Sequence, residues 1–442
     1  MVPSRRVYLL LMVGMVVGLG VSVIGADFGL PQALNGAIWL TLVWDGLILV
    51  LMLLDGLGTK QHRVEVSRTP LDRLSIGRDN SVCLTVTTKS RRAILKIRDA
   101  YPQAFAATPE LLEVGLPAQH QEEVTYSIFP RKRGEYNWGA IQVRQLGAWG
   151  LTWHQWQIPQ AQAVAVYPDL IGLRSLSIKL TLQNTGNLKR VHRIGMGTEF
   201  AELREYSTGD DPRLIDWKAT ARRSRLLLRV LEPEQEQTLI VLLDGGRLMS
   251  AQVQGLAQFD WGLNAALSLA LAGLHRGDRV GMGVFDRQLH TWIPPERGQN
   301  QLAKMIERLT PLQPTLLEPD YLGAITAMTR QQTRRALVVL ITDLIDKTAS
   351  AELLSAMAKL SPRYLPFCVT LRDPQIDVQS QAPMPDVLGG YLRAVALDLL
   401  AQRQLALATL RQQGVLSLDV PANQISEQLV DRYLQIKARS QL

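Results

Sequence analysis

Residues 238–244 read Thr-Leu-Ile-Val-Leu-Leu-Asp, an almost continuous apolar run that ends in an acid. Such a run predicts a strand buried on both faces, as in a parallel sheet. Similar runs follow along the chain, separated by segments with helical periodicity: strands at 279–285, 336–342, 364–371 and 415–420, and helices at 256–274, 301–309, 321–330, 351–360, 388–413 and 424–437. Alternating strands and helices predict a doubly wound α/β domain over residues 237–442.

Acidic residues mark the ends of three of these strands, namely Asp244, Asp286 and Asp343. Ligands of doubly wound sheets lie at the carboxyl ends of the strands, so these carboxylates define a candidate site. The first strand is not followed by a Gly-x-Gly-x-x-Gly pattern, and there is no Walker lysine, so no dinucleotide or nucleoside triphosphate site is expected. The six histidines are isolated and accompany no nucleophile. We therefore expect a protein without enzymatic activity.

The segment before this domain, residues 61–175, alternates apolar and polar residues in short runs separated by turn residues: 81–87, 93–99, 124–128, 140–144 and 164–167. Strands of this spacing predict an antiparallel β-sandwich. Its one basic cluster, Arg131-Lys132-Arg133, lies between Pro130 and Glu135 and is interpreted as a hairpin turn. The net charge of +8 is spread along the chain with acids interleaved, which favours an anionic membrane surface over nucleic acid.

Residues 1–60 contain two uncharged or nearly uncharged apolar runs, about 7–24 and 33–54, each long enough to cross a bilayer. The short connection at 25–32 makes them a transmembrane helical hairpin. A cleavable signal peptide is the alternative for the first run, but its apolar stretch is too long and a second span follows. Bases flank the outer ends of both runs, so the positive-inside rule places both termini in the cytoplasm. Two distant cysteines, Cys83 and Cys368, suit that reducing compartment.

Asp45 interrupts the second apolar run near its middle, where a charge is costly. A contact with a partner helix or a proton-linked site is the functional interpretation. A protonated carboxyl that hydrogen-bonds within the hairpin, to Asn35 or Thr41, is the structural one. Neither run contains a base, so a structural role or an oligomer contact is favoured over transport.

A charged stretch lies between the β segment and the α/β domain, within a predicted linker at 176–236. This junction motif, residues 197–223, reads Gly-Thr-Glu-Phe-Ala-Glu-Leu-Arg-Glu-Tyr-Ser-Thr-Gly-Asp-Asp-Pro-Arg-Leu-Ile-Asp-Trp-Lys-Ala-Thr-Ala-Arg-Arg. Asp210-Asp211-Pro212 predicts the start of a short helix on which Ile215, Ala219 and Arg222 share one face. Two interpretations stay open: a salt-bridge network that braces two domains, or a surface that recognises a partner.

The junction motif resembles the signature of the bacterial domain-of-unknown-function 58 family (DUF58), and the spans, the β segment and the sheet domain fit the same family. The residues that carry the resemblance, and the candidate interaction residues, are Glu199, Phe200, Arg204, Glu205, Tyr206, Gly209, Asp210, Asp211, Pro212, Arg213, Asp216, Trp217, Lys218, Arg222 and Arg223. The resemblance implies a C-terminal domain similar to a von Willebrand factor A domain. It also implies a bacterial inner-membrane location and a MoxR-type AAA+ ATPase as the partner.

Metal-binding A domains hold Mg²⁺ with an Asp-x-Ser-x-Ser motif, a threonine and a later aspartate, which together supply oxygen ligands. By this resemblance Asp244 matches the first ligand, Thr315 the threonine and Asp343 the last carboxylate. Gly246 and Leu248 stand where the two serines belong. The site is therefore degenerate, and no cofactor is expected, with Mg²⁺ the one ion it would suit.

Three functions follow from these features. The first is a membrane-anchored cytoplasmic adaptor, an assembly or chaperone-like partner of a MoxR-type ATPase. The second is a metal-dependent adhesion-type A domain that binds a protein ligand. The third is a metal-dependent hydrolase that uses Asp244, Asp286 and Asp343. The missing serines and the absence of a base or nucleophile favour the first.

Overall fold

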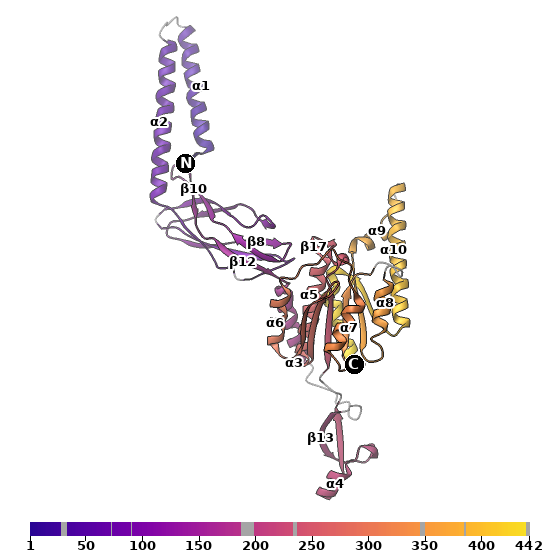
Figure 1. Ribbon diagram of the computed structural model, residues 1–442. Coiled ribbons are helices and arrows are strands. Elements are labelled where there is room, and N and C mark those ends of the chain that lie inside the picture. Colours follow the sequence, from indigo (N-terminus) through magenta and orange to yellow (C-terminus); the bar gives the residue numbers. More distant parts are fainter. Residues whose placement is uncertain are drawn as a thin grey trace. The chain divides into compact units, whose positions relative to one another are not determined.

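The computed structural model describes residues 1–27, 33–71, 73–89, 91–186, 199–232, 237–344, 350–383 and 386–438. The chain divides into two compact units, 1–167 and 168–442, and each is described by itself (Figure 1).

The first unit begins with two antiparallel helices, α1 (Arg5–Asp27) and α2 (Ala33–Gln61). Both are long and apolar enough to cross a membrane, which confirms the two expected apolar helices. Residues 28–32 of the expected connection lie outside the described residues, and residues 25–27 continue α1. Helix α2 runs past the predicted end at 54, because its last two turns pack on the β strands that follow. Asp55 and Thr59 in those turns are buried.

The two helices approach each other closely through glycines. A Cβ atom on Gly14 would overlap the ring of Trp44, and one on Gly18 would overlap Thr41. The Trp44 indole donates a hydrogen bond to the carbonyl of Leu10 at 2.9 Å. Small residues four apart allow helices in an apolar environment to pack backbone against backbone, and this spacing fixes the hairpin's contact face.

The rest of the first unit is a β-rich body made of three sheets. Two are antiparallel, in the orders β1-β11-β10-β5-β7 and β2-β4-β8-β6, and the third, β3-β12-β9, contains the parallel pair β3–β12. The strands are β1 (Val2–Pro3), β2 (Glu65–Arg68), β3 (Arg73–Ser75), β4 (Asn80–Thr87), β5 (Ala93–Asp99), β6 (Phe105–Thr108), β7 (Leu112–Leu116), β8 (Gln121–Pro130), β9 (Gly134–Trp138), β10 (Ile141–Leu146), β11 (Thr152–Ile158) and β12 (Gln162–Tyr167). The β-rich region is confirmed: the five predicted strands are as long as predicted or longer, and further strands occur between and before them.

The two larger sheets are tied together by a buried polar cluster. Asp99 on β5 accepts hydrogen bonds from Arg68 on β2 and from Tyr126 on β8, both at 2.7 Å. The Arg68 guanidinium also lies 5.3 Å from the centre of the buried Trp138 ring. Burial and the Asp99 carboxylate raise the pKa of Tyr126, so its hydroxyl stays a donor. Alternate residues of β4 and β5 are buried, as the period-two pattern requires.

The second unit contains a six-stranded sheet, and residues 238–244 form one of its central strands, as predicted. Its order is β19-β18-β15-β20-β21-β22, with every neighbouring pair parallel except β18–β19. The strands are β15 (Thr238–Asp244), β18 (Arg279–Phe285), β19 (Leu289–Glu296), β20 (Leu337–Thr342), β21 (Leu365–Arg372) and β22 (Leu416–Pro421). The pattern missed β19 because it contains Pro294-Pro295, residues tolerated only in an edge strand such as this one.

Helices cover both faces of this sheet (Figure 1). Their bounds are α3 (Leu170–Gly186), α5 (Gln258–His275), α6 (Gln299–Leu309), α7 (Tyr321–Gln331), α8 (Ala351–Ala358), α9 (Pro374–Gln381), α10 (Val387–Gln412) and α11 (Ile425–Ala438), with short pieces η2 (Arg247–Ser250), β16 (Gln252–Val253), β17 (Leu256–Ala257) and η3 (Ala422–Gln424). The sequence pattern missed α9, and α3 extends into the segment predicted as a linker from residue 176. Leu173 and Leu180 bury α3 against the domain core, so this part is not a free connection.

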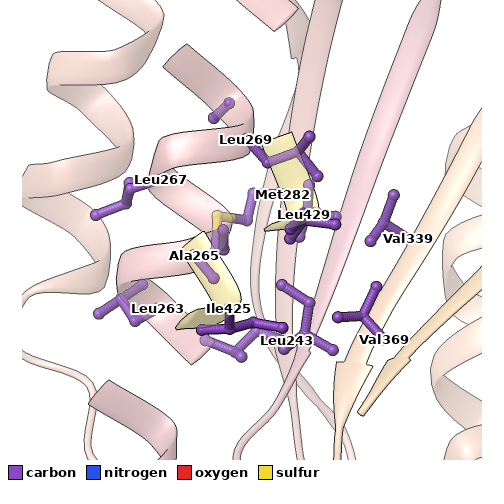
Figure 2. Close-up of a cluster of buried hydrophobic side chains, with 14 of the residues drawn as sticks. Leu243, Leu263, Ala265, Leu267, Leu269, Met282, Val339, Val369, Ile425 and Leu429 are labelled. Carbon is purple, nitrogen blue, oxygen red and sulfur yellow. The ribbon is translucent and has the colours of Figure 1, made fainter. Parts of the chain in front are cut away.

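The core lies on the two faces of the sheet. Figure 2 shows one of them, where Leu269 of α5 lies beside Leu429 of α11, while Leu263 and Leu267 extend from the other side of α5. The other face packs against α7, α8 and α10. Because β15 is buried on both sides, its apolar run has no polar interruptions until Asp244. The layered arrangement brings that carboxylate to the carboxyl edge of the sheet, where the candidate site lies.

Candidate functional site

Three acidic residues meet at the carboxyl edge of the sheet, as predicted. Asp244 is the last residue of β15, and Asp286 and Asp343 directly follow the two neighbouring strands, β18 and β20. Parallel pairing of β15 with both strands brings the three strand ends together. Their contacts, described in turn below, decide what chemistry this edge can perform.

Asp244 is fully buried, and its carboxylate is occupied by donors within the chain. One oxygen accepts from the Gly246 backbone N–H at 2.7 Å. The other accepts from the Thr342 hydroxyl at 2.6 Å and from the Tyr321 hydroxyl at 3.1 Å. Burial raises the pKa of Asp244 despite these hydrogen bonds. The carboxyl therefore acts as a structural acceptor that ties β15 to β20 and α7.

Asp286 forms a second cluster with the threonine expected as a metal ligand. The Thr315 hydroxyl donates to Asp286 at 2.9 Å, and the His290 ring lies 2.6 Å from the other Asp286 oxygen. Burial alone opposes ionisation, but the hydrogen bonds from His290, Thr315 and the Gln288 backbone lower the pKa of Asp286. Thr315, which the resemblance matches to the metal-binding threonine, thus directs its hydroxyl to Asp286 rather than to Asp244.

Asp343 is paired with an arginine that the sequence pattern did not single out. The Arg403 guanidinium, on α10, donates to Asp343 at 2.7 Å and to Asp419 of β22 at 2.8 Å. It also donates to the carbonyls of Leu344 and Leu371. Burial raises the pKa of Asp343, and the Arg403 charge opposes that rise. The Arg403 guanidinium thus occupies the side of Asp343 where the resemblance would place a metal ion.

The residues at this edge do not fit Mg²⁺. A Cβ atom on Gly246 would lie 2.9 Å from the carbonyl oxygen of Leu317, so the loop leaves no room there for the missing serine. Backbone hydrogen bonds hold this closure: Thr315 N–H to the Gly245 carbonyl at 2.7 Å and Arg247 N–H to the Leu317 carbonyl at 2.8 Å. Across the described ranges no group of three or more metal-ligating side chains is assembled. Asp244, Asp286 and Asp343, which the hydrolase alternative places around one cation, each contact separate partners instead.

The described part of the junction motif forms a hairpin together with the strand that follows it, and Figure 1 labels two of the elements, β13 and α4. Its hairpin pairs β13 (Glu199–Glu205) with β14 (Leu227–Glu232), and between them lie η1 (Pro212–Leu214) and α4 (Trp217–Arg223). The expected single helix is wrong: Asp211 caps η1 through the Arg213 N–H, and a second cap, Asp216, starts α4. Ile215 lies between the two helices and bridges to Leu228.

Asp210 and Asp216 of the motif accept hydrogen bonds from the motif itself and from the adjacent strand β14. Asp210 bonds the Arg204 guanidinium at 2.6 Å and the Ser207 N–H at 2.8 Å. Asp216 bonds the Ala219 N–H at 3.0 Å and the Arg229 guanidinium at 2.9 Å. The backbone N–H of Ser207, followed by Arg204, lowers the pKa of Asp210, and Arg229 does so for Asp216. These contacts stabilise the motif itself.

The bases of helix α4 are left exposed. Trp217 is 68% exposed, and Lys218, Arg222 and Arg223 are also exposed. Residues four apart share a helix face, so Trp217 and Ala221 lie beside Lys218 and Arg222. The Thr220 hydroxyl on the opposite side accepts from the Leu227 N–H at 3.0 Å. Among the described residues, no acid pairs with Lys218, Arg222 or Arg223. These three bases, together with the exposed Arg213 and Trp217 of the same motif, are called the basic set below.

Other residues of the junction motif make local contacts or adopt the backbone conformations that its turns require. Glu205 pairs with Arg225 at 2.9 Å, and Tyr206 is half-buried. Gly209 has a φ of 109°, a conformation that glycine adopts without strain, and Pro212 is the first residue of η1. Glu199 and Phe200 lie on β13, and their side chains are outside the described residues.

Asp45 lies on α2 with one carboxyl oxygen buried and without a hydrogen-bond partner in the described part of the chain. The Thr41 hydroxyl donates instead to the Ile38 carbonyl at 2.9 Å. The expected hydrogen bond from Thr41 to Asp45 is therefore not formed by this oxygen.

The geometry describes a protein with two candidate membrane helices, a β-rich body and an α/β region whose strand-end acids are already paired. Residues 202–381 match the model of the family described as "Protein of unknown function DUF58", which confirms the resemblance.

Among the similar proteins are two mycobacterial relatives that are described as uncharacterized. Uncharacterized proteins Rv1480 of Mycobacterium tuberculosis and Mb1516 of Mycobacterium bovis are each 25% identical over 210 residues, 46% of this chain and 65% of theirs. The match thus spans less than two thirds of these relatives. The crystal structure of conserved hypothetical protein BatB from Bacteroides thetaiotaomicron has 17% identity and a TM-score of 0.32, over 46% of this chain and 99% of that one. This similarity is too low to define the fold.

Proposed function

We propose that this protein is a non-enzymatic interaction protein anchored in the inner membrane of a bacterium by the α1–α2 hairpin, with both termini in the cytoplasm. The length and apolarity of the two helices support the anchor. The bases at 5–6 and 60–73 support the orientation, since basic residues flanking membrane helices stay on the cytoplasmic side. A C-terminal fluorescent protein would be bright in this orientation, and a C-terminal alkaline phosphatase would be active in the opposite one.

The basic set of the junction motif is the observation that carries the interaction role. Asp210 and Asp216 form ion pairs within the motif, so they do not neutralise Lys218, Arg222 and Arg223. An exposed tryptophan among uncompensated bases is a typical anchor for a protein partner with an acidic surface. The ion pairs described for the motif stabilise its own hairpin rather than joining two domains, which supports the proposal that the basic set recognises a partner.

The partner best supported is a MoxR-type AAA+ ATPase, and this identity rests on the family resemblance. The C-terminal domain is proposed to be von Willebrand factor A-like, a fold that the parallel sheet with one antiparallel edge strand suits. Binding is proposed to need no Mg²⁺, because Arg403 already neutralises Asp343 and Asp244 is saturated by hydrogen bonds. These pairings weigh against both the metal-dependent adhesion role and the hydrolase.

Co-purification from detergent-solubilised membranes tests the proposal. The variant R222E/R223E reverses two charges of the basic set, and R334E/R335E is a matched control, since it reverses another exposed arginine pair on the α/β domain. We expect the wild type and the control to recover an AAA+ ATPase and R222E/R223E to lose it, with each variant keeping the wild-type melting temperature. Recovery of no AAA+ partner with or without ATP, or equal recovery by R222E/R223E, would refute the proposal.

A further inference from the structure

A basic cavity lies where the first helix of the hairpin meets the β-rich body. Its volume is about 440 Å³, and its lining includes Ser4, Arg5 and Arg6 at the start of α1, Lys96 of β5, Arg144 of β10 and Trp153 of β11. The polar side chains come from separate elements of one compact unit. The cavity belongs to neither the strand-end acids nor the junction motif.

Hydrogen bonds fix the N-terminal residues against the β-rich body. Ser4 donates from its hydroxyl to the Gly150 carbonyl at 2.6 Å and from its N–H to the Leu151 carbonyl at 2.9 Å. Strand β1 pairs with β11, with Val2 opposite Trp153. The arginines that follow are therefore held at the cavity by the fold.

Asp55 of α2 secures the other side of the same junction. Its carboxylate accepts from the backbone N–H groups of Trp149 and Leu151 at 3.0 Å and of Thr152 at 3.3 Å. Leu151 in turn packs against Val7 of α1 and Ile48 of α2. The turn between β10 and β11 is thus fastened to both helices, and the cavity has a built frame.

The cavity carries more positive charge than its paired acid, Glu113, balances. Its lining contains four bases and no acid. Glu113 pairs with Lys96 at 2.6 Å but is largely exposed, and Arg144 bonds the neutral Gln155 at 3.0 Å. Within the described residues, Arg5 and Arg6 form no ion pair. Arginine and lysine arranged around a recess favour an anion with several oxygens, which arginine can bind through two donors at once.

The surroundings of the cavity indicate where that anion comes from. Arg5 and Arg6 directly precede the apolar run of α1, so in the proposed anchor they lie at the cytoplasmic surface of the bilayer. Trp149, on the turn beside the cavity, is 54% exposed, and tryptophan favours the headgroup region of a membrane. Basic pockets at this level bind the headgroups of anionic lipids.

We propose that this cavity binds the phosphate group of an anionic phospholipid from the cytoplasmic leaflet. The inference rests on the proposed membrane anchor. Lipid bound there would orient the β-rich body against the bilayer, because the cavity is framed by Ser4 and Gly150, whose hydrogen bond holds the turn between β10 and β11 to the start of α1. A soluble phosphate compound has the same chemistry, and the experiment below separates the two sources.

The test uses the full chain in nanodiscs of phosphatidylcholine doped with increasing phosphatidylglycerol, and bound lipid is counted by native mass spectrometry. The variant K96Q/R144Q removes two cavity bases without changing the charges that flank the helices. R131Q/K132Q is the matched control, because it removes two exposed bases from another turn of the same body. We expect K96Q/R144Q to weaken phosphatidylglycerol binding about 30-fold and the control to leave it unchanged.

Equal phosphatidylglycerol binding by the wild type and K96Q/R144Q would overturn the site. Displacement of the lipid by inorganic phosphate at micromolar concentration would overturn the lipid source in favour of a soluble phosphate. Resistance of the wild type to carbonate extraction measures the anchor separately. Failure of the anchor is therefore distinguishable from failure of the cavity.

Discussion

Replacing Arg403 with methionine tests whether its guanidinium serves as the built-in cation of the α/β domain. The side chain is only 6% exposed and bonds Asp343 and Asp419 at 2.7 and 2.8 Å. Methionine fills a similar space but leaves two largely buried carboxylates without their shared cation. Breaking a buried ion pair in this way costs about 3–5 kcal/mol. For a domain of this size, we expect the melting temperature to fall by about 6–20 °C.

Cys368 provides the readout for this domain. It is fully buried on β21, and burial raises the pKa of its thiol to about 12, so it reacts with a thiol-specific fluorophore only on unfolding. The assay uses the full chain in detergent with Cys83 replaced by serine, so that one thiol reports. R372M is the control, because Arg372 also bonds Asp419, at 2.6 Å, but is 20% exposed. We expect its melting temperature to fall less than that of R403M.

The pH dependence adds a second criterion. Without Arg403, burial alone raises the folded-state pKa of Asp343 further above its unfolded value. A raised acid pKa destabilises the fold at high pH, and the penalty shrinks as the pH falls and the carboxyl binds a proton. The deficit of R403M should therefore be smaller at pH 5 than at pH 8. A deficit below about 0.5 kcal/mol at pH 8, within the range of ordinary surface substitutions, would refute the reasoning.

Three further predictions concern other parts of the molecule. Millimolar Mg²⁺ or EDTA should shift the Cys368-detected melting temperature by less than about 1 °C, and a rise of several degrees with Mg²⁺ would reveal a cation site. The pKa of Asp216 lies below its ordinary value of 3.8, so the ionised Asp216 stabilises the junction motif above pH 3.8. This stabilisation is lost as the pH falls through the lowered pKa. The variant D216N keeps a side chain that can cap α4, but hydrogen exchange of residues 203–229 should then depend less on pH. G14L should separate the hairpin helices and speed their proteolysis in detergent, whereas G20L, which adds a side chain in open space, should not; equal rates would contradict the packing through Gly14.

Local patterns were enough to predict the main elements. The apolar runs predicted α1, α2 and the four inner parallel strands because each reflects an environment that is apolar on all sides, and alternation predicted the partly buried β22. The pattern also placed Asp244, Asp286 and Asp343 at strand ends. The spacing of Gly14 and Gly18 was a further signal that could have predicted how the hairpin packs.

Local patterns did not predict the partners of these residues. Nothing near Asp343 in sequence indicates Arg403, which lies 60 residues further along the chain. Likewise, Asp55 looks like the end of a membrane helix, and only the fold gives it three backbone donors from a turn more than 90 residues away. The junction motif was recognised by its residues, but its division into internal ion pairs and an exposed basic set depends on the pairing of β13 with β14.

The sequence by itself determined the hairpin helices, the α/β order of the second unit and the DUF58 family, because these depend on hydrophobic periodicity and on a continuous motif. Only the tertiary structure decided that the strand-end acids are paired and that four bases surround a cavity beside the first helix. The physical reason is that charge balance depends on which groups lie within a few ångströms of each other. Chain folding sets those distances between residues that are far apart in sequence.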